Sequence, residues 1–151
     1  MQRLDRQTAT ALLVAATLFM EVLDSTIITT ALPIIAKDFG VAAAHLSVGI
    51  SAYLVAVTVF VPISGWLADR IGPKVIFSAA ICVFVLASLL CAISSDLYTF
   101  TAARVLQGVG GAMMVPVGRL VVIRTLPKKD FVRGMAILTW PALAAPLIGP
   151  V

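Results

Sequence analysis

GWLADRIGPK, the stretch at residues 65–74, joins two long apolar runs and places a carboxylate and two cations between them. Its glycines, Gly65 and Gly72, predict a close approach of the flanking helices and a tight turn, because glycine has no Cβ atom. Asp69 is expected to cap a helix end or to bridge there, since a carboxylate can accept hydrogen bonds from the backbone N–H groups that open a helix. The whole loop is therefore a candidate latch for one conformational state.

The cations of this loop, Arg70 and Lys74, also bear on the orientation of the chain. Basic residues gather on one side of the expected spans, at Arg3, Arg6, Arg70, Lys74, Arg124, Lys128, Lys129 and Arg133. Lys37 alone falls on the other side. Because cytoplasmic loops carry the excess of Lys and Arg, the N-terminus is expected to be cytoplasmic. For Arg70 and Lys74, setting this topology is an alternative to a role in the latch.

The composition around the loop is that of a membrane protein. Apolar residues make up 61% of the 151 residues and charged residues 12%, with a mean hydropathy of +1.10, whereas soluble domains are about 45–50% apolar. A bilayer core of about 30 Å is crossed by roughly 20 helical residues. Runs that reach or approach this length lie at residues 11–35, 47–68, 75–93 and 97–123, and a fifth opens at 135 and stops at 151. We therefore expect an all-α transmembrane protein with four complete spans and an incomplete fifth.

The organisation expected from these runs is a single partial membrane domain over residues 1–151. The fifth run carries several prolines and ends with the chain, so we expect an N-terminal fragment or a truncated reading frame. Arg3 and Arg6 ahead of an apolar run are also typical of a secretory signal peptide. The length of that run and the three spans that follow it argue against cleavage.

Polar residues inside the first run form a stripe on an otherwise apolar helix. At 100° per residue, the four side chains of this stripe fall within about 100° of one another; they are Thr17, Glu21, Asp24 and Ser25. A carboxylate at mid-membrane costs about 2.5–3.5 kcal/mol even on the more lenient insertion scale. Such residues mark functional sites, so the stripe is expected to face a cavity.

The fourth run carries a second stripe with a cation and an amide. Its members share one helix face and are Arg104, Gln107, Gly108, Gly111 and Gly118. Arg104 and Asp24 lie at similar depths, counting about 1.5 Å per residue from the outer ends of their runs. Our hypothesis is that Asp24, or Glu21 one turn away, exchanges a proton and that Arg104 stabilises the ionised carboxylate. A fixed structural ion pair is the alternative.

Four segments carry a resemblance to a known family. Residues 65–74 resemble motif A of the major facilitator transporters, a Gly-x-Leu-Ala-Asp-Arg-x-Gly pattern followed by basic residues. RVLQGVG, at residues 104–110, resembles the fourth-helix motif of that family. LDSTIITTALP, at 23–33, resembles the first-helix signature of its fourteen-helix drug:proton antiporters, and APLIGP, at 145–150, resembles the start of their helix-five antiporter motif. Together these matches extend over nearly the whole chain.

The chain departs from these patterns at three positions. Pro73 replaces one basic residue of the loop motif, Thr29 stands where the first-helix signature has Asn, and Ala145 replaces a usual Gly. The chain also stops before the Gly-Gly pair that completes the helix-five motif. The loop motif and the fourth-helix motif therefore carry the family resemblance, and the antiporter branch is less well supported because its helix-five motif is incomplete.

The resemblance implies a transporter of twelve or fourteen helices in two six-helix bundles, with substrate held near mid-membrane and alternating access by rocking. It implies proton-driven multidrug efflux of amphipathic small molecules, with Asp24 and Glu21 favouring lipophilic cations. The helix-five antiporter motif would include Pro146, Gly149 and Pro150. Expected partners are the lipid bilayer, protons, the substrate and the C-terminal helices that the chain lacks. The expected location is a bacterial-type inner cell membrane.

Other classes of function lack their parts in the sequence. There is one His and there are two Cys, without CxxC spacing, so neither metal nor enzymatic chemistry is expected, and the proton gradient is the only energy source expected in place of a cofactor. The net charge of +4 comes from basic residues spread between apolar runs, which argues against nucleic-acid binding.

Two alternatives to a large transporter remain open from the sequence. The chain can be a small four-helix exporter that dimerises and uses Glu21 as a shared proton and cation site. It can also be a truncated membrane product that does not transport. Further helices encoded beyond Val151 would favour the large transporter, and a native stop codon would favour a truncated product.

Overall fold

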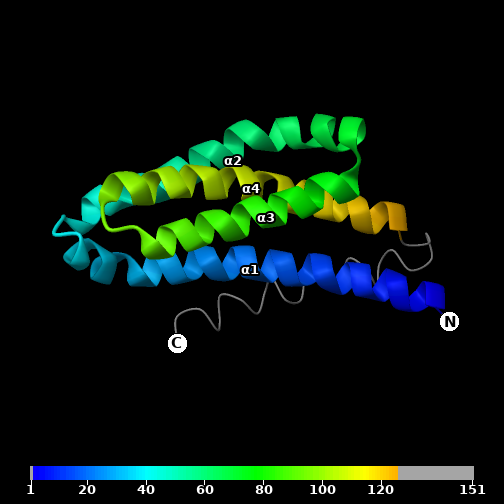
Figure 1. The fold of residues 1–151 in the computed structure, drawn as a ribbon, viewed down its shortest axis with the longest axis horizontal. Helices are drawn as coiled ribbons and strands as arrows, with labels where there is room; N and C mark the ends of the chain where they lie inside the picture. The colour runs from blue at the N-terminus through cyan, green and yellow to red at the C-terminus, as the bar shows by residue number, and fades with distance from the viewer. Residues whose placement is uncertain (1, 126–151) are drawn as a thin grey trace. The chain divides into compact units, whose positions relative to one another are not determined.

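The structure is a computed structural model that describes residues 2–125 (Figure 1). In this range the chain forms α-helices and no strand: α1 (Gln2–Asp38), α2 (Ala43–Ile71), α3 (Pro73–Ile93) and α4 (Leu97–Thr125). Each contains a stretch long and apolar enough to cross a membrane, Ala9–Asp38 in α1 and the whole length of the other three. The predicted all-α transmembrane fold is confirmed. The fifth run and its antiporter-motif residues Pro146, Gly149 and Pro150 lie outside the described residues.

All four helices extend beyond the apolar runs that predicted them. α1 continues through Lys37 to Asp38, where Gly40 adopts a left-handed conformation with φ of 65°. There the N–H of Val41 donates to the carbonyl of Ala36 at 3.0 Å, a bond that closes the helix end around a glycine. Hydropathy marks only the part of a helix that lies in hydrocarbon, whereas the helix itself continues until a turn residue stops it.

Asp96 opens α4 as its N-cap. Its Oδ1 accepts hydrogen bonds from the backbone N–H groups of Tyr98 at 2.8 Å and Thr99 at 2.9 Å. Its Oδ2 accepts a bond from the Thr99 hydroxyl at 2.8 Å. These donors, first the Thr99 backbone and then its hydroxyl, hold the pKa of Asp96 below its ordinary value of 3.8. The ionised carboxylate thus satisfies N–H groups that the helix leaves without an internal partner.

Replacing Asp96 with asparagine is expected to remove a pH dependence while keeping the cap. The depressed pKa means that the contribution of the charge to stability is complete above about pH 3.8 and is lost as the pH falls through the lower folded pKa. Asn caps helices about as well as Asp. Thermal unfolding of the purified protein between pH 3 and pH 6 should therefore show an advantage of the wild type over Asp96→Asn that shrinks toward the acid end. An advantage that stays constant with pH would contradict this role.

Within the described residues, the packing divides the chain into two compact units, residues 2–29 with 118–125 and residues 30–117. In the first unit, the buried apolar side chains include Ala11, Val14 and Leu18 of α1 and Val121 and Val122 of α4. The three residues of α1 are spaced by three and four positions, so they lie on one face of that helix.

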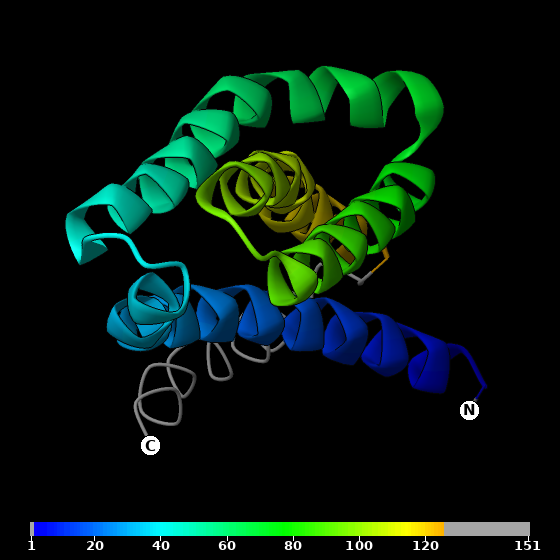
Figure 2. The ribbon, with the colours of Figure 1, turned by 60° about the vertical axis from the view of Figure 1, so that its left-hand side comes forward.

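In the second unit, α4 lies between α2 and α3 (Figure 2). Its central position agrees with burial, because 56% of the most apolar window of α4 is buried, against 17–28% in the other three helices. Phe84 of α3 and Phe100 of α4 are among the largest fully buried side chains. α4 is therefore the central helix of this unit. The buried residues of its polar stripe are shielded from lipid by the neighbouring helices.

Large apolar side chains cover the outside of α2 and α3. Val55 is 63% exposed, Leu86 is 59% exposed and Ile93 is 76% exposed. Many exposed apolar side chains of this kind are unfavourable in water and favourable in hydrocarbon. Together with the four membrane-length helices, it indicates an integral membrane protein.

Candidate functional site

The polar stripe of α4 is buried. All five of its residues are buried, namely Arg104, Gln107, Gly108, Gly111 and Gly118. The side chain of Arg104 is 3% exposed and that of Gln107 is 0% exposed. A spacing of three, four and seven residues returns to one face of a helix, which is why these residues share it.

Two glycines of α4 let the neighbouring helices approach closely. A Cβ atom at Gly108 would lie 2.6 Å from the backbone oxygen of Tyr53 and 2.7 Å from Cβ of Ala56, both on α2. A Cβ atom at Gly110 would lie 2.8 Å from the backbone nitrogen of Phe84 on α3. Real Cβ atoms do not approach this closely, so only glycine fits at either position. α2 therefore packs closely on α4 at Gly108, and α3 does so at Gly110, next to the polar stripe.

Arg104 lies against two aromatic rings. Its Cζ is 5.6 Å from the ring centroid of Phe100, one turn earlier on α4, and 5.9 Å from that of Tyr53 on α2. A guanidinium within about 6 Å of a ring centroid is attracted by the negative face of the ring, and more strongly where water is excluded. The buried cation is therefore held by rings from two helices.

Gln107 lies one turn beyond Arg104 on the same face. Its Oε1 accepts a weak hydrogen bond from the thiol of Cys91 on α3, with Sγ and Oε1 3.8 Å apart. Its Nε2 is buried and has no hydrogen-bond partner among residues 2–125. The amide links α4 to α3 on one side and carries an unused donor on the other, in a place where an acceptor would be favourable.

The polar stripe of α1 is graded in its exposure. Thr17 is buried, its hydroxyl donating to the carbonyl of Val14 at 2.8 Å. Glu21 and Asp24 are half-buried, and Ser25 is exposed. These residues belong to the first unit, whereas Arg104 and its amide neighbour belong to the second. The pairing of a carboxylate of α1 with Arg104 stays a prediction.

Residues 65–74 were expected to form a loop, but all except Gly72 are helical, because residues 65–71 end α2 and residues 73–74 begin α3. The chain turns at Gly72, as predicted. Gly72 has φ of 109°, a value that side-chain-bearing residues rarely adopt, and its N–H donates to the carbonyl of Ala68 at 2.9 Å. Pro73 follows as the first residue of α3, where its missing N–H leaves no bond unmade and its fixed φ suits the helix. One residue thus ends α2 and the next begins α3.

Close helix approach at Gly65 is not found among the described residues, and capping by Asp69 is excluded for α3. A Cβ atom at Gly65 would meet nothing within 4 Å among the described residues, because this side of α2 faces outward, so Gly65 is not a site of close helix approach there. The N-cap of α3 is Gly72, and no side-chain hydrogen bond caps that helix end, because the glycine turn already closes it. Asp69 therefore does not cap α3, and its capping of another helix end or its bridging role stays a prediction.

Three charged side chains lie near the turn at Gly72, and all three are exposed: Asp69 and Arg70 at the end of α2 and Lys74 at the start of α3. The Cζ of Arg70 lies 5.3 Å from the ring centroid of Trp66, one turn earlier on α2. Trp66 is itself 59% exposed. A tryptophan with a cation beside it is typical of the membrane–water interface, which agrees with this loop lying at a membrane surface.

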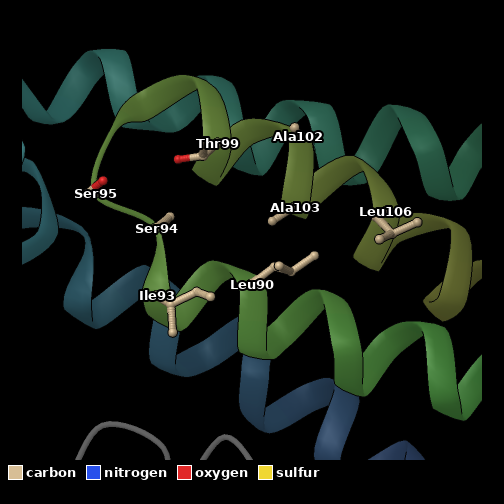
Figure 3. A pocket seen from close by; sticks show the side chains of 8 residues that line it. All are labelled: Leu90, Ile93, Ser94, Ser95, Thr99, Ala102, Ala103 and Leu106. Carbon is tan, nitrogen blue, oxygen red and sulfur yellow. The ribbon is translucent and has the colours of Figure 1, made fainter.

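A cavity of about 420 Å³ lies between α3 and α4 and contains none of the predicted site residues (Figure 3). The turn at Ser94 and Ser95 forms one end of it, with Thr99 near by. The rest of its lining is apolar and comes from Leu90, Ile93, Ala102, Ala103 and Leu106. The small side chains of Ala102 and Ala103 are the sequence feature that goes with this cavity. Small residues are so common in membrane spans that they do not predict a cavity.

Sequence reasoning also missed Tyr53 and Phe100, the rings beside Arg104. Phe100 was open to prediction, because residues four apart share a helix face. Tyr53 was not, since nothing local to α2 indicates which residue of α4 it meets. Among residues 2–125 no group of three or more His, Cys, Asp or Glu side chains is placed to hold a metal ion.

Comparison with known proteins adds to this geometry. A sequence profile of the Major Facilitator Superfamily matches residues 14–151. Proteins of Salmonella paratyphi B, Salmonella heidelberg and Salmonella typhimurium, provisionally named multidrug resistance protein MdtD, are each 49% identical to the chain over 138 residues. Each alignment covers 91% of the chain and 29% of the relative. The chain thus spans less than a third of the length of these relatives.

Proposed function

The chain belongs to the Major Facilitator Superfamily, and on that premise we propose that it serves proton-driven efflux of amphipathic small molecules, lipophilic cations among them. The name of the Salmonella relatives supports a multidrug substrate range. The excess of Lys and Arg in the expected inner loops supports a cytoplasmic N-terminus in the cell membrane. The proposed activity is transport, with no chemical change to the substrate.

The observation that carries this proposal is the burial of Arg104 in a membrane-length helix, where its side chain is 3% exposed. Placing a guanidinium at membrane depth costs about 2.5–3.5 kcal/mol even on the lenient scale. Charged side chains are kept at this depth mainly where they line ion or proton pathways. Glu21 and Asp24 of α1 supply carboxylates in a second membrane-length helix, so both signs of charge needed for proton exchange are present.

The roles proposed for individual residues follow from chemistry. Asp24 or Glu21 binds and releases the proton, and its ionised form attracts the cationic substrate. Arg104 stabilises that ionised form, and Gln107 offers its buried amide to the same region. The loop around Gly72 latches one conformational state through its charged residues.

The helix-five motif residues, Pro146, Gly149 and Pro150, complete the antiporter part of the proposal. Proline and glycine in a membrane helix provide bends and close contacts, which suit a helix that moves during alternating access.

Transport in vesicles tests the proposal. The full-length protein would be reconstituted in liposomes and given a fluorescent lipophilic cation and an imposed pH gradient. We expect the cation to move against its concentration gradient while the pH gradient lasts, and to stop when a protonophore removes it. Empty liposomes control for passive partition of the dye. Movement that persists unchanged without the gradient would refute proton coupling, and no movement of any amphiphile tried would refute drug efflux.

A further inference from the structure

Among residues 9–125, Arg104 is the one buried cation, and two aromatic rings lie beside it. Phe100 and Tyr53 place their ring centroids 5.6 and 5.9 Å from its Cζ. The rings come from α4 and α2, so the contact ties the guanidinium to two helices at once.

The Phe100 ring is itself fixed on two sides. Its edge meets the ring of Phe39, with centroids 6.1 Å apart and planes at 72°. On another side α2 presents Gly49, where a Cβ atom would lie only 2.7 Å from Cε1 of Phe100. The same added atom would lie 3.7 Å from Cγ of Arg104. The backbone of α2 at Gly49 therefore packs closely against the Phe100 ring and lies near the stem of the arginine, which leaves the ring little room to move.

We propose that Tyr53 and Phe100 are positioning residues that hold the guanidinium of Arg104 in one place for proton coupling. A long arginine side chain has many rotamers, and a charge that moves among them acts weakly on any one carboxylate. Two ring faces that attract the guanidinium, in a site that excludes water, select one position. The inference rests on the proposed function, because it assumes that the charge of Arg104 acts on a proton-carrying group.

Substitution of the rings tests the assignment in the full-length protein. Phe100→Leu and Tyr53→Leu each remove one ring, and we expect the pH at which transport is half-maximal to move toward higher pH by about one unit, the measure of a tenfold change in the proton equilibrium. The shift arises because a mobile guanidinium stabilises the ionised carboxylate less. Phe100→Tyr and Tyr53→Phe keep an aromatic ring beside Arg104, so the pH of half-maximal transport should stay at the wild-type value.

Two further variants separate positioning from packing. Phe84→Leu removes a fully buried ring from α3 that does not lie beside Arg104, so it should lower thermal stability and leave the pH midpoint unchanged. Gly49→Ala keeps both rings but pushes its Cβ into the Phe100 ring, so it should move the midpoint in the same direction as Phe100→Leu. Gly49→Ala also keeps the test open if a leucine variant fails to fold.

The outcomes distinguish this inference from the function it rests on. If the wild type shows no dependence on the pH gradient, the proposed function fails. If the wild type is proton-coupled and Arg104→Gln moves the midpoint, while both ring-removing variants leave it unchanged, the positioning role alone is overturned. A shift in Phe84→Leu equal to that in Phe100→Leu would also overturn it, because packing would then explain both.

Discussion

Gly108→Ala is expected to lower the free energy of unfolding by about 1–3 kcal/mol, the usual result of forcing extra volume into a packed interior. The added Cβ would lie 2.6 Å from the backbone oxygen of Tyr53, and a backbone atom cannot rotate away as a side chain can. α2 would have to move off α4. Gly108→Val should have a larger effect for the same reason. Equilibrium denaturation of the purified protein in mixed micelles measures the change.

A matched control exists in α2. Gly65 is a helical glycine whose added Cβ meets nothing within 4 Å among the described residues. Gly65→Ala should therefore leave stability unchanged or raise it by up to about 1 kcal/mol, because alanine is the better helix former. Equal losses in Gly65→Ala and Gly108→Ala would mean that the contact between α2 and α4 does not decide the outcome.

This pair of glycines also shows where sequence reasoning stops. Both lie in segments that resemble family motifs, and a close helix contact was expected at Gly65. Only Gly108 makes such a contact among residues 2–125, because α4 lies between two other helices, whereas a Cβ added at Gly65 meets nothing within 4 Å. Motif spacing identifies a glycine that matters but does not give the partner that it meets. That partner depends on how helices pack, which the sequence of one helix does not contain.

Other features of the fold were predictable because their causes are local. Membrane-length helices follow from apolar length, and the burial of the Arg104 face follows from helical periodicity. The turn at Gly72 follows from a glycine before a proline at the start of a helix. The two rings beside Arg104 were not equally predictable. Phe100 shares its helix and was within reach of prediction, whereas Tyr53 approaches from α2 and required the structure.

Asp24→Asn in the full-length protein is expected to reduce proton-driven transport by roughly a hundredfold or more, the range in which a positioned proton-transfer group contributes. Asparagine keeps the shape of the side chain and loses the ability to exchange a proton. Exchange of labelled substrate across the membrane without a pH gradient should fall much less, because that reaction needs alternating access and no net proton movement. Glu21→Gln, measured in the same way, decides which of the two carboxylates of α1 carries the proton.

A neighbouring substitution and a double variant separate proton exchange from a fixed ion pair. Ser25→Ala changes an exposed side chain beside Asp24 and should leave transport unchanged. If Asp24 only neutralises Arg104, then Asp24→Asn should mainly lower stability, and combining it with Arg104→Gln should restore both stability and transport, since the unpaired charge is gone. If Asp24 carries the proton, the double variant stays inactive however stable it is. Full coupled transport by Asp24→Asn would exclude it as the proton carrier, because an amide has no proton to release at physiological pH.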